Sequence, residues 1–300
     1  MNIPIKYLYL LCAISKQAHA QALAREKLIQ DKRWLYIGLM LQVRELHPGM
    51  GLRKMYNQFQ PEGIGRDAFI AIGMEEGLRL QVSRNPTRTT WGNKRYSYPN
   101  LLAGIKFTDV NQVWSSDITY YSLEGKHYYI VFIMDVYSRK IVGYSVADHM
   151  RASLNIAALE KALNLRGISD YERQLIHHSD RGSQYISEDY THLLTEFGIR
   201  ISMCREVLEN AHIERVNGTI KNEYLRYWDI RNFNDLEKNL KKAVENYNNR
   251  AHNALKGETP NDFEIHLKGV PLNQRKEMAI FTRISDSGNN ANQLNLFKSV

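Results

Sequence analysis

The sequence of 300 residues is poor in cysteine, holding only Cys12 and Cys204. Two distant cysteines exclude a disulfide scaffold and give no zinc-finger spacing, so the ten histidines lack a thiolate frame for a metal. Internal repeats and long low-complexity runs are absent as well. No apolar run approaches the roughly 20 residues that a membrane-spanning helix needs. We therefore expect a cytoplasmic protein in a reducing compartment, without membrane partners.

Acidic residues are missing from 79–106, whereas Lys and Arg are frequent there. The six basic residues of this segment are Arg79, Arg84, Arg88, Lys94, Arg95 and Lys106, with Trp91, Tyr96 and Tyr98 between them. A segment of one sign with interleaved aromatic rings suits a linker that follows a phosphate backbone. A merely solvated linker is the alternative. The net charge of +8 and the pI near 9.3 also fit a polyanionic partner.

The N-terminal region, 1–82, predicts only helices. Residues 1–30 are rich in Ala, Leu and Gln, and 36–46 show helical spacing up to Pro48-Gly49. Short helices are expected at 52–59 and 66–76. Three short helices with tight turns in a basic protein resemble a helix-turn-helix DNA-binding module. Three-helix packing without DNA remains equally open. The basic linker is placed at 83–107.

Strand and helix patterns alternate over 108–265, and 266–300 are expected to form a C-terminal tail. The expected strands are Val113–Ser122, His127–Asp135, Lys140–Ala147, Gln174–His178 and Ile199–Met203. The expected helices are Ser153–Leu165, Glu188–Phe197, Asn210–Trp228 and Asp235–Asn248. This order predicts an α/β domain with a mixed sheet flanked by helices, as a ribonuclease-H-like fold requires.

Two aspartates lie in or at the end of apolar strands, where an ionised side chain is unfavourable without a partner. Asp117, in Trp114-Ser-Ser-Asp117-Ile-Thr-Tyr, interrupts an apolar strand, where an unpaired charge is expensive unless a cation neutralises it. Asp180, in His178-Ser-Asp180-Arg-Gly-Ser-Gln-Tyr, ends a strand at the sheet edge where α/β sites usually form. A helix N-cap role is the alternative for Asp180. Asp135 also ends a strand, and we expect it to serve the following turn rather than a metal.

A glutamate completes the acidic set. In Asn210-Ala-His-Ile-Glu214-Arg-Val-Asn-Gly, a polar strip covers about 60° of a helix beside an apolar stripe. The strip holds Asn210, Glu214, Asn217 and Lys221, and the stripe holds Ile213, Val216 and Ile220. The stripe packs the helix on the sheet, so Glu214 points toward the strands. An ordinary exposed glutamate is the alternative, with Glu206 and Glu209 as weaker candidates.

The residue types indicate the chemistry. Three neighbouring carboxylates repel one another, and hard divalent cations such as Mg²⁺ or Mn²⁺ reverse that repulsion. Two ions about 3.5–4 Å apart activate an attacking water or 3′-hydroxyl and stabilise the leaving oxygen. Asp117, Asp180 and Glu214 are therefore the expected catalytic metal ligands. Lys221, two turns beyond Glu214, is predicted to bind a DNA phosphate near the cut, unless it only solvates the helix.

At these residues the chain resembles the Asp-Asp-Glu integrase-catalytic-core superfamily, and within it the second-reading-frame (OrfB) transposases of the bacterial insertion-sequence family numbered three. The resemblance spans roughly Trp34 to Phe263, and 47–80 look like the family's helix-turn-helix module. Beyond the Asp117 and Asp180 motifs, it rests on Asp135-Val-Tyr-Ser-Arg-Lys-Ile-Val-Gly, Tyr247-Asn-Asn-Arg250-Ala-His252 and Thr259-Pro260. The family's triad falls on Asp117, Asp180 and Glu214. The stretch between the last two is slightly shorter here than is usual in the family.

The resemblance implies a DNA transposase that cuts the ends of an insertion sequence and transfers the 3′-hydroxyl strand to a new phosphodiester. It also implies terminal inverted repeats and target DNA as substrates, and a homo-oligomer assembled on DNA. An upstream first-frame DNA-binding protein, or a fusion with it, is a further expected partner, and the enzyme would associate with the nucleoid. A ribonuclease-H-like nuclease without strand transfer, or an inactive DNA-binding remnant, are the competing hypotheses.

Overall fold

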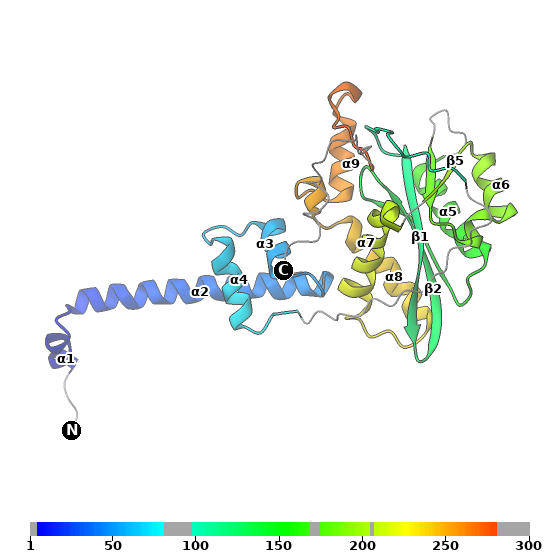
Figure 1. The fold of residues 1–300 in the computed structure, drawn as a ribbon. Coiled ribbons are helices and arrows are strands. Elements are labelled where there is room, and N and C mark those ends of the chain that lie inside the picture. Colours follow the sequence, from blue (N-terminus) through cyan, green and yellow to red (C-terminus); the bar gives the residue numbers. More distant parts are fainter. Residues whose placement is uncertain (1–4, 81–97, 169–174, 205–206, 281–300) are drawn as a thin grey trace, which may run out of the picture. The chain divides into compact units, whose positions relative to one another are not determined.

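The computed structural model describes residues 5–80, 98–168, 175–204 and 207–280. The chain forms two compact units (Figure 1). The N-terminal unit comprises Met1–Thr87 together with Asn222–Asp229, and the core unit comprises Arg88–Lys221 and Ile230–Val300. Among the described residues, no helix combines the length and the apolar character needed to cross a membrane.

The N-terminal unit is helical, as the sequence predicts. It contains α1 (Ile5–Leu11), α2 (Lys16–Leu46), α3 (Leu52–Phe59) and α4 (Arg66–Glu75). The C-terminal part of α2 packs with α3 and α4 around Met40, Met55 and Phe69, which are almost fully buried. The sequence analysis expected three short helices, and the first of them, at 36–46, is instead the C-terminal part of the long helix α2. No proline interrupts Lys16–Leu46, so α2 continues through the whole range.

Residues Asn222–Asp229 belong to this unit because they contact the connection between α2 and α3. The Gly49 amide donates a 2.8 Å hydrogen bond to the Glu223 carbonyl. A Cβ on Gly49 would stand 2.4 Å from the Glu223 Cα, so this approach requires glycine. The His47 ring and the Tyr224 hydroxyl share a buried 2.9 Å hydrogen bond.

The core unit is built on a five-stranded mixed sheet in the order β3-β2-β1-β4-β5. The strands are β1 (Val113–Leu123), β2 (Lys126–Asp135), β3 (Ile141–Ala147), β4 (Ile176–Ser179) and β5 (Arg200–Met203). The first three form an antiparallel meander, and β4 and β5 add in parallel beside β1. The expected ribonuclease-H-like mixed sheet is confirmed.

Helices cover both faces of the sheet (Figure 1). One face carries α5 (Ala152–Arg166) and α6 (Glu188–Glu196), and the other carries α7 (Ala211–Thr219) and α8 (Phe233–Asn248). On the first face, α5 lies so close to β3 that a Cβ on Gly143 would stand 2.2 Å from the Ala158 carbonyl oxygen. Trp114, Val131 and Leu159 belong to the buried core of that face.

Alternation along β1 decides which side chains reach each layer. Trp114 packs in the core under α5, and Ser116 shares a 2.9 Å hydrogen bond with the hydroxyl of Tyr185, before α6. Ser115 and Asp117 point the other way, and both bond side chains from the α7 region. The strand thus presents Asp117 to α7.

The expected helix Asn210–Trp228 is wrong in its second half. The α-helix α7 ends at Thr219, and Ile220–Leu225 continue as a π-helix. Ile220, Tyr224 and Leu225 are all fully buried.

A helix that the sequence analysis did not predict, α9, spans Pro260–Lys268. Thr259 caps it by accepting a 3.0 Å hydrogen bond from the Asp262 amide, and Pro260 occupies the first turn. Both residues are ordinary helix-start signals. Beyond α9, the backbones of Met278 and Phe107 exchange two hydrogen bonds of 2.8 Å, which returns the chain to the start of the core.

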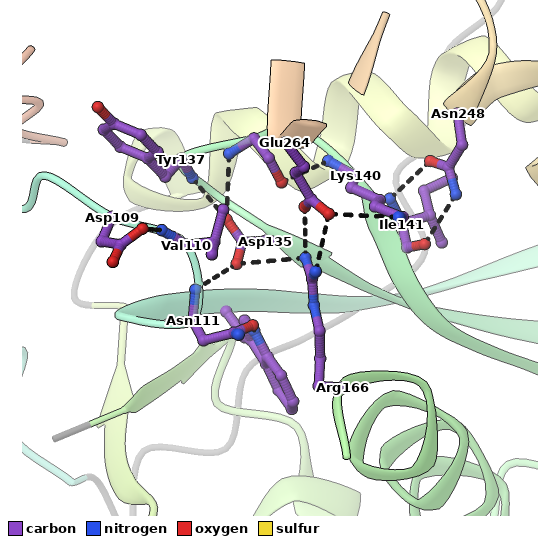
Figure 2. Close-up of polar contacts among 12 residues, drawn as sticks. Asp109, Val110, Asn111, Asp135, Tyr137, Lys140, Ile141, Arg166, Asn248 and Glu264 are labelled. Carbon is purple, nitrogen blue, oxygen red and sulfur yellow. Dashed lines mark hydrogen bonds and ion pairs between the residues drawn. The ribbon is translucent and has the colours of Figure 1, made fainter. Parts of the chain in front are cut away.

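Asp135 serves the turn after β2, as predicted (Figure 2). Its Oδ1 accepts from the amides of Tyr137 at 3.0 Å and Ser138 at 3.1 Å, and its Oδ2 accepts from the Asn111 amide at 2.6 Å. Burial raises the pKa of the Asp135 carboxyl, and the charge of Arg166 opposes that shift. The Asp135 side chain is fully buried.

Arg166, at the end of α5, joins this turn to α9 (Figure 2). Its guanidinium lies 3.6 Å from Asp135 and forms two hydrogen bonds, of 2.8 and 2.6 Å, with the carboxylate of Glu264. Burial alone would raise the pKa of Glu264, but the hydrogen bonds and charge of Arg166 outweigh it and lower that pKa. Lys140 adds a 3.3 Å ion pair to Glu264.

Candidate active site

Asp117 lies in the middle of β1, opposite Phe132 of β2. Its Oδ2 accepts a 2.7 Å hydrogen bond from Asn217 of α7. Burial raises the pKa of Asp117 to about 8, and repulsion from Asp180 and from Glu214 adds to the shift. The charges of Asp180 and Glu214 therefore both act on Asp117.

Asp180 follows β4, the parallel neighbour of β1. Its Oδ1 accepts a 3.0 Å hydrogen bond from the Gly182 amide, which fixes the carboxylate at the sheet edge. The short helix that follows begins at Ser183 with Gly182 as its N-cap, so the alternative N-cap role for Asp180 is wrong. Burial raises the pKa of Asp180, and the Gly182 amide opposes that shift.

Glu214 lies in the first turn of α7 on the solvent-exposed side. The apolar residues Ile213 and Val216 beside it are buried, as the predicted stripe requires. Partial burial raises the pKa of the Glu214 carboxyl. The alternative candidate Glu209 lies beside His178 instead, and Glu206 falls outside the described residues.

Contacts between α7 and β1 fix the position of Glu214. At the helix start, Asn210 accepts a hydrogen bond from the Ser115 hydroxyl and donates one of 3.0 Å to the Ser116 carbonyl. Just after the helix, Lys221 donates a 3.1 Å hydrogen bond to the Thr119 hydroxyl. The sequence analysis placed Asn210 in the polar strip of this helix but gave it no role. An amide on the sheet-facing side of a helix was the available signal.

Lys221, the predicted phosphate-binding residue, also lies with its ammonium 4.7 Å from the centre of the Tyr120 ring. Burial lowers the pKa of Lys221, and the charge of Asp117 opposes that shift. The Lys221 ammonium thus contacts Thr119 and Tyr120 of β1, the strand that carries Asp117. The other predicted DNA-binding residues, Arg84, Arg88, Lys94 and Arg95, lie outside the described residues.

The carboxylates do not form a closed metal cage in this arrangement. Within the described ranges, no three Asp, Glu, His or Cys side chains converge closely enough to hold one ion. The donor set nevertheless fits a hard divalent cation. Asp117 lies on β1, and Asp180 directly follows the neighbouring strand β4. Burial makes the ionised form of each costly without positive charge nearby, and repulsion from Asp180 and Glu214 adds to that cost at Asp117. The third carboxylate, Glu214, is exposed on α7.

Two histidines next to Asp180 stabilise the sheet rather than bind metal. They face opposite ways on β4, as predicted for adjacent strand residues. His177 shares a 2.9 Å hydrogen bond with Tyr190, and His178 contacts Ser202 at 2.9 Å and Cys204 at 3.1 Å. Burial lowers the pKa of His177 to about 3 and that of His178 to about 4, so both are neutral near pH 7.

Two integrase core domain families match the sequence, one over 108–207 and the other over 198–260. Among curated proteins, the chain is 31% identical over 236 residues to the transposase for insertion sequence element IS629 of Shigella sonnei, covering 77% of this chain and 78% of that protein. It is 34% identical over 206 residues to a 31 kDa protein of insertion element IS600 of Shigella sonnei, covering 67% and 75%. The transposase for IS904 of Lactococcus lactis is 34% identical over 173 residues, covering 56% and 67%.

Among solved structures, the catalytic core domain of HTLV-2 integrase in complex with magnesium aligns with a TM-score of 0.43 at 24% identity, covering 55% of this chain and 99% of that one. The intasome of simian T-cell lymphotropic virus aligns with a TM-score of 0.43 at 16% identity, covering 71% and 74%.

Proposed function

Since this chain belongs to the insertion-sequence transposases with an integrase core, and among them to the OrfB type of the family numbered three, we propose that Asp117, Asp180 and Glu214 form its catalytic centre. The protein is a DNA transposase, and hence a polynucleotidyl transferase with endonuclease activity. Integrase-core enzymes use divalent metal. To this centre we assign two ions, Mg²⁺ or Mn²⁺, held by the three carboxylates.

The observation that carries this assignment is the electrostatic coupling at Asp117. Burial and the charges of Asp180 and Glu214 together raise its pKa to about 8. Such a set of carboxylates is unfavourable in an empty site and favourable around divalent cations. We assign the closing movement to the exposed side chain of Glu214, because Asp117 and Asp180 are each fixed by a hydrogen bond.

Two successive displacements make up the reaction. In the first, water cleaves a phosphodiester at the 3′ end of the element: a P–O bond forms to the water oxygen while another breaks, and the element keeps a free 3′-hydroxyl. In the second, that hydroxyl attacks a target phosphodiester, forming one P–O bond and breaking one. No covalent protein intermediate is required. Bound divalent ions supply positive charge that stabilises the attacking and leaving oxygens.

The chain's own residues prepare the centre. The Asn217 amide and the Gly182 amide orient the two aspartates before the substrate arrives, which reduces reorganisation during the reaction. The Lys221 ammonium is hydrogen-bonded to Thr119 of β1, the β-strand that carries Asp117, and it binds a phosphate of the DNA strand that is cut. These residues bind and orient the substrate, and they transfer no atoms themselves.

DNA contacts outside the core complete the proposal. The helices α2, α3 and α4 act as a helix-turn-helix module for the terminal inverted repeats. Arg84, Arg88, Lys94 and Arg95 grip the phosphate backbone between that module and the core. Several copies assemble on the DNA, together with the upstream first-frame protein or as a fusion with it.

Cleavage and joining of DNA that carries the element's ends test the assignment. Asp117→Asn and Asp180→Asn should each keep DNA binding and reduce Mg²⁺-dependent cleavage by roughly 10³-fold or more, because each removes a charged metal ligand. Asp189→Asn, on the exposed surface of α6, is the control and should cleave normally. Normal cleavage by either catalytic variant would show that the triad is misassigned.

Pre-cut ends separate the competing functions. A transposase joins them to a target in the presence of Mg²⁺. Cleavage without joining would favour a ribonuclease-H-like nuclease. DNA binding without any metal-dependent reaction, even with the first-frame protein added, would favour an inactive remnant.

A further inference from the structure

Asn217 is a polar residue in a place that disfavours one. It lies in α7, one turn after Glu214, and only 7% of it is exposed. Asparagine is a poor residue for a helix interior, and a buried amide is costly unless its polar atoms are bonded. The position therefore calls for partners on both sides of the amide.

Only one side of that amide is bonded. Its Nδ2 donates a 2.7 Å hydrogen bond to Oδ2 of Asp117. Its Oδ1 is buried and has no hydrogen-bond partner among the residues that the structure describes. A buried acceptor without a donor bears the full cost of losing water, and such an atom calls for a donor that binds there.

Asn210 provides a comparison on the same face of the sheet. Its amide is also buried, but both ends are bonded, to Ser115 and to Ser116. The arrangement around α7 thus satisfies a purely structural amide completely. Of these two amides packed against β1, the one with an unpaired oxygen is the one that bonds Asp117.

We propose that Asn217 is a positioning residue of the catalytic centre, with its Nδ2 fixing the Asp117 carboxylate and its Oδ1 accepting a hydrogen bond from a water molecule held there. This inference rests on the proposed function of Asp117. The nitrogen sets which carboxylate oxygen remains available to a cation. The oxygen takes one O–H of the water and leaves a lone pair of that water free, which suits the first displacement.

The amide of Asn217 suits this positioning role because it is neutral. A hydrogen bond from a neutral amide holds a carboxylate without a competing positive charge, so the aspartate keeps its affinity for a cation. Groups that orient a ligand in this way typically change metal affinity or activity by about 10–100-fold when they are removed. Leucine has nearly the shape of asparagine, so Asn217→Leu removes both hydrogen bonds with little change in packing.

The experiment measures Mn²⁺ binding to the full chain without DNA, by electron paramagnetic resonance, and Mg²⁺-dependent cleavage in parallel. Asn217→Leu should weaken Mn²⁺ binding by about 10–100-fold and should raise the Mg²⁺ concentration needed for half-maximal cleavage. Asn217→Ser, which is too short to reach Asp117, should do the same and carries the test if the leucine variant does not fold. Urea unfolding reports whether each variant is folded.

Asn155→Leu is the matched control. Asn155 is also a buried helical asparagine, on α5, and both polar atoms of its amide are unpaired. Its replacement should leave Mn²⁺ binding and cleavage unchanged. Mn²⁺ affinity within about twofold of the wild type in folded Asn217→Leu or Asn217→Ser, while Asp117→Asn has lost binding, would overturn the role of Asn217 alone. Unchanged Mn²⁺ binding in Asp117→Asn would instead overturn the metal assignment.

Discussion

Asn210 donates a 3.0 Å hydrogen bond through Nδ2 to the main-chain carbonyl of Ser116, and this bond sets where α7 begins on the sheet. Glu214 lies one turn further along that helix. The position of the third carboxylate thus depends on an amide that is not itself acidic.

Asn210→Ala should lower the free energy of unfolding by about 1–3 kcal/mol, because the Ser116 carbonyl and the Ser115 hydroxyl lose their partner in a buried place. Cleavage should fall as well, since Glu214 is no longer held in place. Urea unfolding and the cleavage assay measure the two effects. Asn261→Ala removes a side-chain hydrogen bond on the surface and serves as the control. An Asn210→Ala protein as stable as the control would contradict the role given to this amide.

Arg166→Met should destabilise the core by about 3–5 kcal/mol, because it removes the cation beside the buried carboxylate of Asp135 and leaves Glu264 with the longer ion pair from Lys140. Lys126→Met breaks an exposed ion pair with Asp148 in the same unit and should change stability far less, because water screens both charges. The comparison is made by urea unfolding at constant pH. Equal effects of the two substitutions would show that the buried cluster contributes no more than a surface pair.

His177 should make the protein sensitive to acid. Burial lowers the pKa of His177 to about 3 in the folded chain, whereas its pKa in the unfolded chain is about 6.5. Between pH 6.5 and pH 3 the unfolded chain therefore binds one more proton at this residue than the folded chain. Stability should therefore fall as the pH falls, by about 1.4 kcal/mol per pH unit from this group. His177→Gln should reduce that slope, whereas His192→Gln, at an exposed position on α6, should not. Unfolding curves between pH 6.5 and pH 4 give the slopes, and identical slopes for all three proteins would exclude this contribution.

Two glycine substitutions in the N-terminal unit should have opposite effects. Gly49→Ala forces a Cβ to within 2.4 Å of the Glu223 Cα and should cost about 1–3 kcal/mol of stability. Gly38→Ala, in the exposed part of α2 with nothing within 4 Å of the added Cβ, should stabilise the helix by about 0.5–1 kcal/mol. Thermal unfolding distinguishes the two. A stabilising Gly49→Ala would mean that residues near Glu223 move away at little cost.

The sequence predicted the core sheet well because its strands carry local signals. Alternating Tyr, Ile and Val residues mark β1 and β2, and Glu124-Gly125 marks the turn between them. The same locality explains why Asp117 and Asp180 stand out as candidate site residues, since each interrupts or ends an apolar run. The turn role of Asp135 was predicted on similar grounds and is confirmed by its three backbone hydrogen bonds.

Other features depend on contacts between distant residues and carry little local signal. Asn217 and Asp117 are far apart in the sequence, and no pattern near either residue indicates that they bond. The change from α-helix to π-helix at Ile220 is not indicated by the helical spacing of the apolar residues there. The start of α9 does carry a local signal, because Thr259 and Pro260 form an ordinary helix N-terminus.

The inclusion of Asn222–Asp229 in the N-terminal unit has a practical consequence for dissecting the enzyme. The polypeptide passes from one unit to the other three times, after Thr87, after Lys221 and after Asp229. If the chain is cut at any one of these three points, neither fragment contains both units complete, and at least one unit is divided between the fragments or left joined to part of the other. Chimeras that swap only the first 87 residues between relatives would pair a foreign Gly49 with the resident Glu223, so both segments have to be exchanged together.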